Sequence, residues 1–202
     1  MSERTATRSA VIALREERKA MREGCAFLDE KCLLLAGRML AELRARDALA
    51  LAIAGPLARA TAALAGALGR HGLVGLQAQP PLGPGTRRLV ARSRPLLGVP
   101  LLEAAIEGAP SPALPAANPS PETEECRAAF DALLDPLARL AAIDANLTRL
   151  QAEYRRTARR VRALEDVLLP ELDREGDAME SALAELEQDE ALWARFAAGS
   201  RP

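Results

Sequence analysis

Aromatic residues are scarce in this chain. Phe, Trp and Tyr supply only 2% of its 202 residues, although 49% of the residues are hydrophobic and most of those are alanine or leucine. Compact globular cores usually contain more large rings, whereas Ala, Leu, Glu and Arg in a helical repeat are typical of long helices. The composition therefore argues against an ordinary globular domain and favours an all-α dominated fold.

Residues that commonly perform catalysis are also few. His71 is the only histidine, and its place at the predicted end of the first helix indicates a solvent-exposed helix-end residue. The segment Gly83-Pro84-Gly85-Thr86 lacks the Gly-Lys-Ser/Thr ending of a phosphate-binding loop. The acidic residues near the C-terminus are spread around a helix, where no pocket would shift their pKa values. We therefore predict that the protein is not an enzyme and has no catalytic residues and no cofactor.

The chain has three cysteines, an odd number. Cys25 and Cys32 lie seven residues apart, and no histidine or further cysteine is near enough in sequence to complete a tetrahedral zinc site. We interpret both as small core thiols and predict no metal site. The sequence shows no signal peptide, and Gly55-Pro56 interrupts its apolar run at residues 49–54. We therefore expect a protein of the reducing cytoplasm with no direct membrane insertion.

Hydrophobic residues recur in alternating steps of three and four at both ends of the chain. The C-terminal series is Leu147, Leu150, Tyr154, Thr157, Val161, Leu164 and Leu168. The N-terminal series, with one polar interruption, is Thr7, Val11, Leu14, Arg18, Met21, Cys25, Leu28, Cys32, Leu35 and Met39. Such spacing places each series on one narrow stripe of a helix. Two stripes separated by a non-helical middle predict a long antiparallel two-helix coiled coil, formed by the N- and C-terminal helices.

Charge is segregated although the formal net charge is only −1. The first turns are basic, with Arg4, Arg8, Arg15, Arg18, Lys19 and Arg22. The last helix is acidic, with Glu171, Asp173, Glu175, Asp177, Glu180, Glu185, Glu187, Asp189 and Glu190. Antiparallel pairing places these opposite charges side by side. The small net charge provides no overall field that would attract nucleic acid or an anionic membrane.

The middle of the chain is rich in proline and predicts three segments. We expect an N-terminal coiled-coil helix at 1–72, a Pro-rich head at 73–121 and a C-terminal coiled-coil helix at 122–202. Within the head, 86–93 reads as a short β-strand whose hairpin partner is 73–79, and 100–107 reads as a short helix or tight turn. Residues 109–121 read as a flexible connector.

Two prolines fall inside the predicted helices. Pro56 should bend or interrupt the first helix, because it removes a hydrogen bond and crowds the preceding turn. Pro170 should kink the second helix without ending it, because the hydrophobic pattern resumes at Leu172.

A basic cluster marks the second helix, with arginines at 155, 156, 159, 160 and 162. A DNA-binding basic helix has a similar composition, but such helices continue into parallel zippers, whereas here the hydrophobic stripe runs through the cluster. We therefore predict no nucleic-acid binding. Two interpretations remain, a plain solvated face and a contact with an acidic protein partner; we assign Arg155, Arg156, Arg159 and Arg160 to partner binding.

Three motifs resemble the D-subunit family, the central-stalk rotor subunits of V-type (in archaea, A-type) rotary ATPases. The most specific is Arg156-Thr-x-Arg159-Arg160-Val161-x-Ala163-Leu164-Glu165-x-Val167-x-x-Pro170-x-Leu172. The N-terminus is similar through Thr7-x-Ser9-x-x-x-x-Leu14 and Gly24-x-x-x-Leu28-x-x-Lys31, and the head through Leu97-Gly98-Val99-Pro100. The sequence departs from the family at Arg162, where asparagine is common, and at Cys32, where arginine is common.

The resemblance implies a rotor shaft that couples ATP hydrolysis or synthesis to ion translocation, including proton (hydrogen ion) transport. Its joined ends would insert into the hexamer of A and B subunits. Its other end, with the F subunit alongside, would dock on the funnel-shaped subunit above the membrane ring. The protein would then be cytoplasmic and peripheral to the membrane. A non-motor coiled-coil scaffold or adaptor is the alternative; the F-type rotor subunit fits less well, because its middle insertion is a substantial α/β domain.

Overall fold

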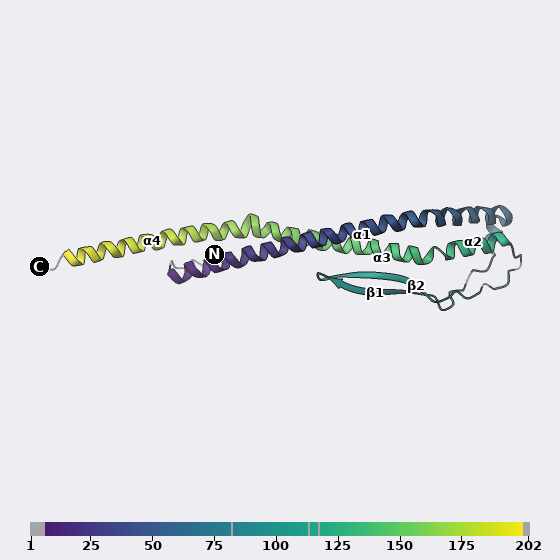
Figure 1. Cartoon of the computed structure of the whole chain (residues 1–202), viewed down its shortest axis with the longest axis horizontal. Helices are drawn as coiled ribbons and strands as arrows, with labels where there is room; N and C mark the ends of the chain where they lie inside the picture. Colours follow the sequence, from purple (N-terminus) through teal and green to yellow (C-terminus); the bar gives the residue numbers. More distant parts are fainter. Residues whose placement is uncertain (1–6, 82, 113, 117, 200–202) are drawn as a thin grey trace. The chain divides into compact units, whose positions relative to one another are not determined.

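The computed structural model describes residues 7–81, 83–112, 114–116 and 118–199. Its elements are α1 (Arg8–Gln77), β1 (Arg88–Leu96), β2 (Val99–Glu107), α2 (Pro121–Asp131), α3 (Leu134–Ala163), the π-helical turn η1 (Leu164–Leu168) and α4 (Leu169–Gly199) (Figure 1). Long helices near both ends and a small antiparallel sheet between them confirm the predicted fold class.

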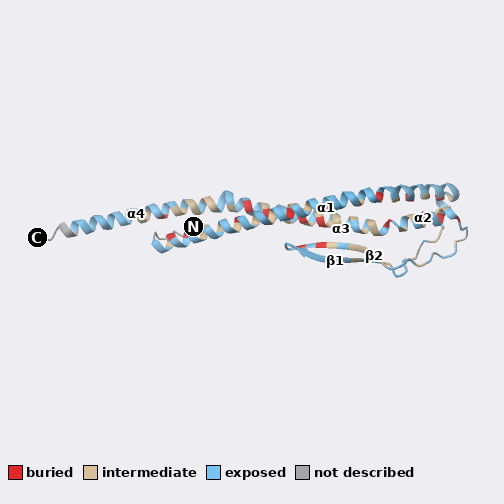
Figure 2. Cartoon of the chain, in the orientation of Figure 1, coloured by how far each residue is buried: buried red, intermediate tan, exposed pale blue. Residues whose placement is uncertain are grey.

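The chain forms two compact units, which are described separately. The terminal unit comprises Met1–Leu34 and Tyr154–Pro202, and the central unit comprises Leu35–Glu153. Burial along the helices is confined to scattered positions, and most of α4 is exposed (Figure 2). Each unit therefore depends on a few narrow hydrophobic contacts.

The core of the terminal unit joins the two ends of the chain. Val11 and Leu14 of α1 are buried against Met179 of α4. Ala10, Leu172 and Leu183 pack around them. All of these residues except Ala10 belong to the predicted stripes or continue them, so the predicted pairing of the N- and C-terminal helices is confirmed within this unit.

Ion pairs flank that hydrophobic contact. Arg8 Nη2 lies 2.6 Å from Glu187 Oε1, and Arg15 Nη2 lies 2.8 Å from Glu180 Oε1. Arg18 Nη1 lies 2.9 Å from Asp173 Oδ1. Each later residue of α1 pairs with an earlier residue of α4, which is the antiparallel order that the charge pattern predicts; Arg4 lies outside the described residues. Because exposed pairs each contribute only about 0–1 kcal/mol, they select the alignment more than they stabilise it.

The prediction that Pro56 bends or interrupts the first helix finds no support in the backbone. The helix continues through Pro56, and among the described residues of α1 only Gly72 has non-helical angles (φ 64°, ψ 172°). Pro56 removes one hydrogen bond, and the alanine-rich helix around it retains the others. The predicted helix end near Gly72 thus coincides with a kink, after which helical structure resumes to Gln77.

A π-helical turn precedes Pro170. The Leu169 N–H donates to the carbonyl of Leu164, a step of five residues. Proline has no N–H and its ring crowds the carbonyl four residues earlier, so a wider turn just before it relieves the crowding. The helix continues as α4, so the prediction that Pro170 does not end the helix is confirmed, while the predicted kink is replaced here by a π-helical turn. The hydrophobic stripe is weakened nearby, since Leu168 is 40% exposed whereas Thr157 and Val161 are buried.

The hairpin of the central unit differs from the predicted one. Strand β1 pairs with β2 in antiparallel register, with Leu96 opposite Val99. The predicted partner strand at 73–79 is wrong, because α1 extends to Gln77, and the predicted helix or turn at 100–107 is wrong, because this segment is β2. The two-residue turn Leu97-Gly98 has positive φ at both positions (51° and 86°), as a type I′ turn requires.

Leu97 is an unfavourable residue for this turn. A leucine at positive φ is strained, whereas asparagine tolerates that conformation and Asn-Gly is the preferred type I′ pair. We expect Leu97→Asn to stabilise the hairpin by about 1 kcal/mol. Slower amide hydrogen exchange in β1 and β2 would show the gain, and Gly98→Ala should have the opposite effect. Unchanged exchange in Leu97→Asn would contradict the assigned turn.

Strand β2 is attached to α3 by side chains that complete its hydrogen bonding. Asn146 accepts a bond from Leu102 N–H at 2.7 Å and donates one to the Leu102 carbonyl at 2.9 Å. Asp135 accepts a bond from Ile106 N–H at 3.0 Å. Beneath the strand, a buried cluster joins α1, β2 and α3 and comprises Leu35, Val99, Leu101 and Leu150, with Met39 packed against it. The hairpin is therefore an integral part of the central unit.

The second long helix begins in two pieces. Ser120 caps α2, its side chain accepting a bond from Thr123 N–H, and Pro121 occupies the first turn. The helix pauses after Asp131 and restarts at Leu134, just before Pro136, which lacks the N–H that would bond to the preceding turn. Around this pause, Ile53, Ala60 and Leu133 form a second cluster of the central unit.

Candidate functional site

The basic cluster occupies the end of α3, within the terminal unit. Arg155, Arg156, Arg159 and Arg160 are all exposed. Two residues of the same segment are buried: Thr157, which lies between Arg156 and Arg159, and Val161, which follows Arg160. The helix thus holds one narrow face inside the unit and presents the arginine side chains to solvent. This arrangement is compatible with binding an acidic partner, and equally with a solvated face.

A groove of about 570 Å³ lies in the central unit between the hairpin, α1 and α3. Its walls include Arg92 and Arg94 of β1 and the buried Glu42 of α1, which accepts a 2.6 Å bond from Arg38. Among the described residues, the walls contain no histidine, cysteine or serine. Arginine and glutamate side chains dominate its polar lining, which suits the binding of a charged group.

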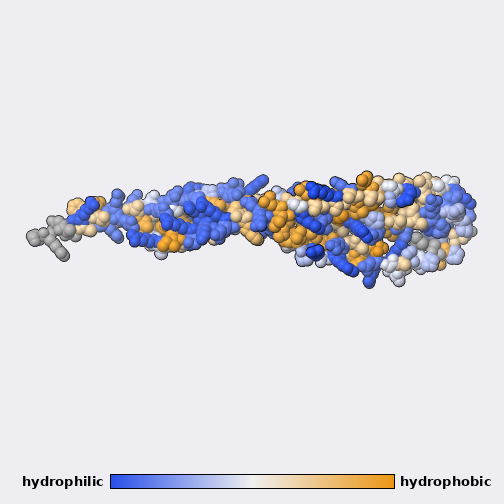
Figure 3. Space-filling view, viewed as in Figure 1, coloured by the Kyte–Doolittle hydropathy of each residue, from blue (hydrophilic) through white to orange (hydrophobic). Residues whose placement is uncertain are grey.

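The part of α1 that lies in the central unit exposes an unusual amount of apolar surface. The large exposed side chains are Leu40, Leu43, Leu51, Leu57, Leu64, Leu68, Leu73 and Val74. An 18-residue window of α1 has a mean hydropathy of 1.6, enough to cross a membrane by length and composition, and only 11% of that window is buried. Figure 3 shows weakly hydrophobic positions, in tan, over this end of the helix. Contiguous exposed apolar surface is typical of protein or membrane interaction sites and of ligand-binding grooves.

His71 is not simply a solvent-exposed helix end, as its sequence position indicated. Its Nε2 atom lies 2.7 Å from Ser120 Oγ, and Ser120 is buried as the N-cap of α2. Nearby, Glu122 has its pKa lowered by a hydrogen bond to its own backbone N–H at the start of α2 and by Arg70, whose Nη1 lies 2.9 Å from Glu122 Oε1. These contacts attach the end of α1 to α2, which is a structural role.

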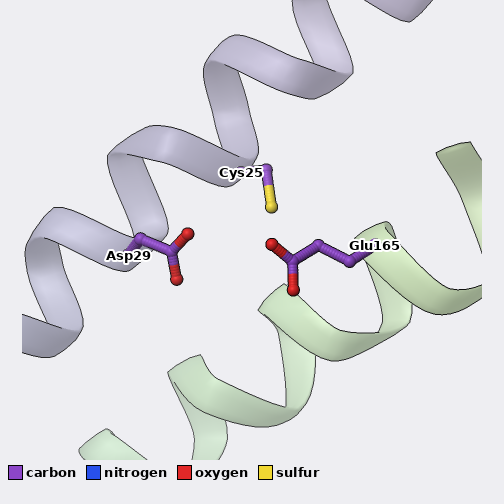
Figure 4. A group of neighbouring side chains, drawn as sticks. All are labelled: Cys25, Asp29 and Glu165. Atoms are coloured by element: carbon purple, nitrogen blue, oxygen red, sulfur yellow. The ribbon is translucent and has the colours of Figure 1, made fainter.

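The three cysteines are free thiols. Cys25 is buried, as predicted for a core thiol, whereas Cys32, for which the same was predicted, is only half-buried. Cys126, for which no prediction was made, is also buried. Two carboxylates lie close to Cys25, which the sequence did not indicate. The Cys25 Sγ atom, one carboxylate oxygen of Asp29 and one of Glu165 all lie within 4.8 Å of one another (Figure 4). Burial raises the pKa of the Cys25 thiol, and the two carboxylates raise it further.

The aromatic residues near the C-terminus lie on the surface. Trp193 is 75% exposed and Phe196 is 73% exposed, on the last turns of α4. Leu186 and Leu192 of the same helix are also exposed. The end of α4 therefore carries a second exposed apolar surface.

Sequence reasoning missed the residues that attach the hairpin. Asn146 is buried between stripe positions of α3, and Asp135 bonds to a strand backbone. The available signal was a polar amide directly before Leu147, the first residue of the predicted hydrophobic stripe. It pointed to a polar partner without identifying that partner as a strand.

Comparison with known proteins gives one family. The family model that describes the D subunit of ATP synthase matches residues 10–195, which is nearly the whole chain. Comparison with curated proteins gives no match.

Proposed function

Because the chain belongs to the D-subunit family of ATP synthases, and is thus a stalk subunit of a rotary ATPase, we propose that it is the central rotor shaft of a V-type complex. In this role it couples ATP hydrolysis or synthesis in the hexamer of A and B subunits to ion translocation by the membrane ring. The shaft itself performs no catalysis. It lies in the cytoplasm and associates with the membrane through its partners.

The antiparallel pairing of the two chain ends is the observation that carries this proposal. Val11, Leu14 and Met179 hold the ends together, and ion pairs flank them on the surface. A shaft made of two helices is eccentric in cross-section, so each of its orientations favours a different conformation of the subunits around it. Such a shaft needs stiffness and a smooth surface, and no active-site pocket.

We assign a different partner to each of the two exposed apolar surfaces, the end of α4 and the part of α1 in the central unit. The end of α4, with Trp193 and Phe196, suits insertion into the A and B hexamer. The apolar surface of α1 in the central unit suits docking on the funnel-shaped subunit above the ring, with the F subunit alongside. The domain division at 1–72, 73–121 and 122–202 is retained here as a functional one: two shaft helices and a head.

The basic cluster of α3 is assigned to partner contact. We expect a variant with Arg155, Arg156, Arg159 and Arg160 all changed to glutamine to lose ATP-driven ion pumping by at least about tenfold, because each charge pair lost at a binding surface weakens association. Glutamine preserves helix propensity. The matched control changes the same four residues to lysine, which keeps the charge. Normal pumping by the glutamine variant, measured in vesicles, would leave the cluster as a solvated face.

Purification under native conditions tests the proposed assembly. A tagged full-length chain should bring down A, B and F subunits in one complex that hydrolyses ATP. The alternative, a non-motor scaffold or adaptor, predicts self-association without these subunits. Recovery of the chain only as a homo-oligomer would therefore reject the rotor assignment.

A further inference from the structure

Three potential metal ligands meet in the terminal unit. Cys25 and Asp29 lie four residues apart on α1 and so share one helix face, while Glu165 comes from the π-helical turn η1. Figure 4 shows the sulfur and the two carboxylates directed toward one another. Helix α1 thus supplies a thiol and one carboxylate, and η1 supplies a second carboxylate to the same place. An acidic patch along a single helix would lack both the thiol and the ligand from a second element.

The Cys25 thiol lies in a negatively charged environment. The Cys25 residue is only 5% exposed, and its pKa is raised by burial, by the Glu165 charge and hydrogen bond, and by the Asp29 charge. Within the described part of the chain, neither carboxylate forms an ion pair with an arginine or lysine, although other acidic residues of this unit, such as Asp173 and Glu180, do. A divalent cation would supply the missing positive charge and would favour the thiolate.

We propose that Cys25, Asp29 and Glu165 form a zinc site that links α1 to η1. A thiolate with two carboxylates suits zinc, which accepts both sulfur and oxygen ligands, whereas magnesium and calcium require oxygen ligands throughout. The carboxylates are exposed, so a water molecule completes a tetrahedral set. Zinc bonds of about 2.3 Å to sulfur and about 2.0–2.2 Å to oxygen require the ligand atoms to approach by roughly one ångström, within reach of two exposed side chains.

A zinc ion at this site would hold the π-helical turn η1 against α1. Pro170 distorts the helix at this level, and Leu168 no longer covers the stripe. A metal bridge at Glu165 would connect η1 to α1 close to the point where Leu168 is exposed. Binding to the folded state alone stabilises it, and the Cys25 proton is released as the metal binds.

The test titrates Co²⁺ and then Zn²⁺ into the full-length chain after treatment with a chelator. Wild type should develop the sulfur-to-cobalt charge-transfer absorption, which zinc abolishes by displacement, and zinc should raise the melting temperature. Cys25→Ser should lose the absorption. Cys32→Ser is the matched control, since Cys32 lies on the same helix outside the cluster, and it should retain the absorption.

Glu165→Gln keeps the test independent of folding, because the side chain is exposed. We expect it to bind zinc at least about tenfold more weakly by competition with a chromophoric chelator, since one of three protein ligands is lost. Absence of the absorption in wild type would overturn the proposal. So would its persistence in Cys25→Ser, its loss in Cys32→Ser, or an unchanged zinc affinity in Glu165→Gln. None of these results bears on the rotor assignment, which does not require a metal.

Discussion

Replacing Leu150 by aspartate is expected to unfold the central unit. The Leu150 side chain is fully buried against Leu35, Val99 and Leu101, where helices α1 and α3 meet strand β2. Aspartate would leave a cavity and an unpaired charge in that contact, a cost of roughly 5 kcal/mol or more. Small folded units have a total stability of about 5–15 kcal/mol. Thermal unfolding followed by circular dichroism would measure the loss, and the variant should fail to couple in the assembled complex.

The neighbouring residue provides the control. Gln151 is exposed on the same helix turn, so Gln151→Asp introduces the same charge without entering the core. Its melting temperature should stay within a few degrees of wild type, because substitutions at exposed sites usually change stability by less than about 0.5 kcal/mol. If Leu150→Asp had the same melting temperature as Gln151→Asp, the burial of Leu150 between the helices and the hairpin would be contradicted.

Asn146→Ala is expected to release the hairpin from α3. The Asn146 side chain both accepts from and donates to the backbone of Leu102, and it is buried. Its loss leaves an N–H and a carbonyl of β2 without partners, a cost of roughly 2–4 kcal/mol. Amide exchange should accelerate in β2 more than in α3, since the strand loses its attachment while the helix retains its own bonds.

Arg149→Ala separates this effect from a general loosening. Arg149 also bonds β2, through Nη1 to the Pro100 carbonyl at 3.3 Å, but it does so on the surface. Removing an exposed, long hydrogen bond should cost less than about 0.5 kcal/mol. Equal acceleration of exchange in both variants would show that Asn146 has no special role in holding the hairpin.

Periodicity and charge predicted the paired ends because both depend on local spacing alone. The positions of Val11 and Leu14 follow from the three-four repeat, and their burial against Met179 follows from the need to cover a stripe. The ion pair of Arg15 with Glu180 follows from the basic start and the acidic end once the pairing is antiparallel. Pro170 was also interpretable, since its effect on the preceding turn is steric.

The hairpin was mispredicted because its turn uses an unexpected residue. Leu97 adopts a positive φ, which asparagine or glycine would have indicated, and strand β2 begins with Val99-Pro100. Proline in a strand usually argues against one. The pairing of residues 88–96 with 99–107 thus depends on tertiary contacts with α3 that local propensity does not contain.

The cluster of Cys25, Asp29 and Glu165 could not be predicted from the sequence, for a different reason. Cys25 and Glu165 are 140 positions apart in the sequence, and their approach depends on the exact register of η1 against α1. A π-helical turn shifts that register by a fraction of a turn, which the hydrophobic pattern does not reveal. The same holds for Asn146 and Leu102 in the central unit.

Direct observation of rotation tests the central claim. Arg44 of α1 is exposed in the central unit, and in a Cys32→Ser background Arg44→Cys offers an accessible thiol for a bead. With the A and B hexamer fixed to a surface, the bead should turn in one direction while ATP is hydrolysed and stop when ATP is removed. A bead that stays still on complexes that hydrolyse ATP would place this chain in the stationary part of the machine and contradict the account.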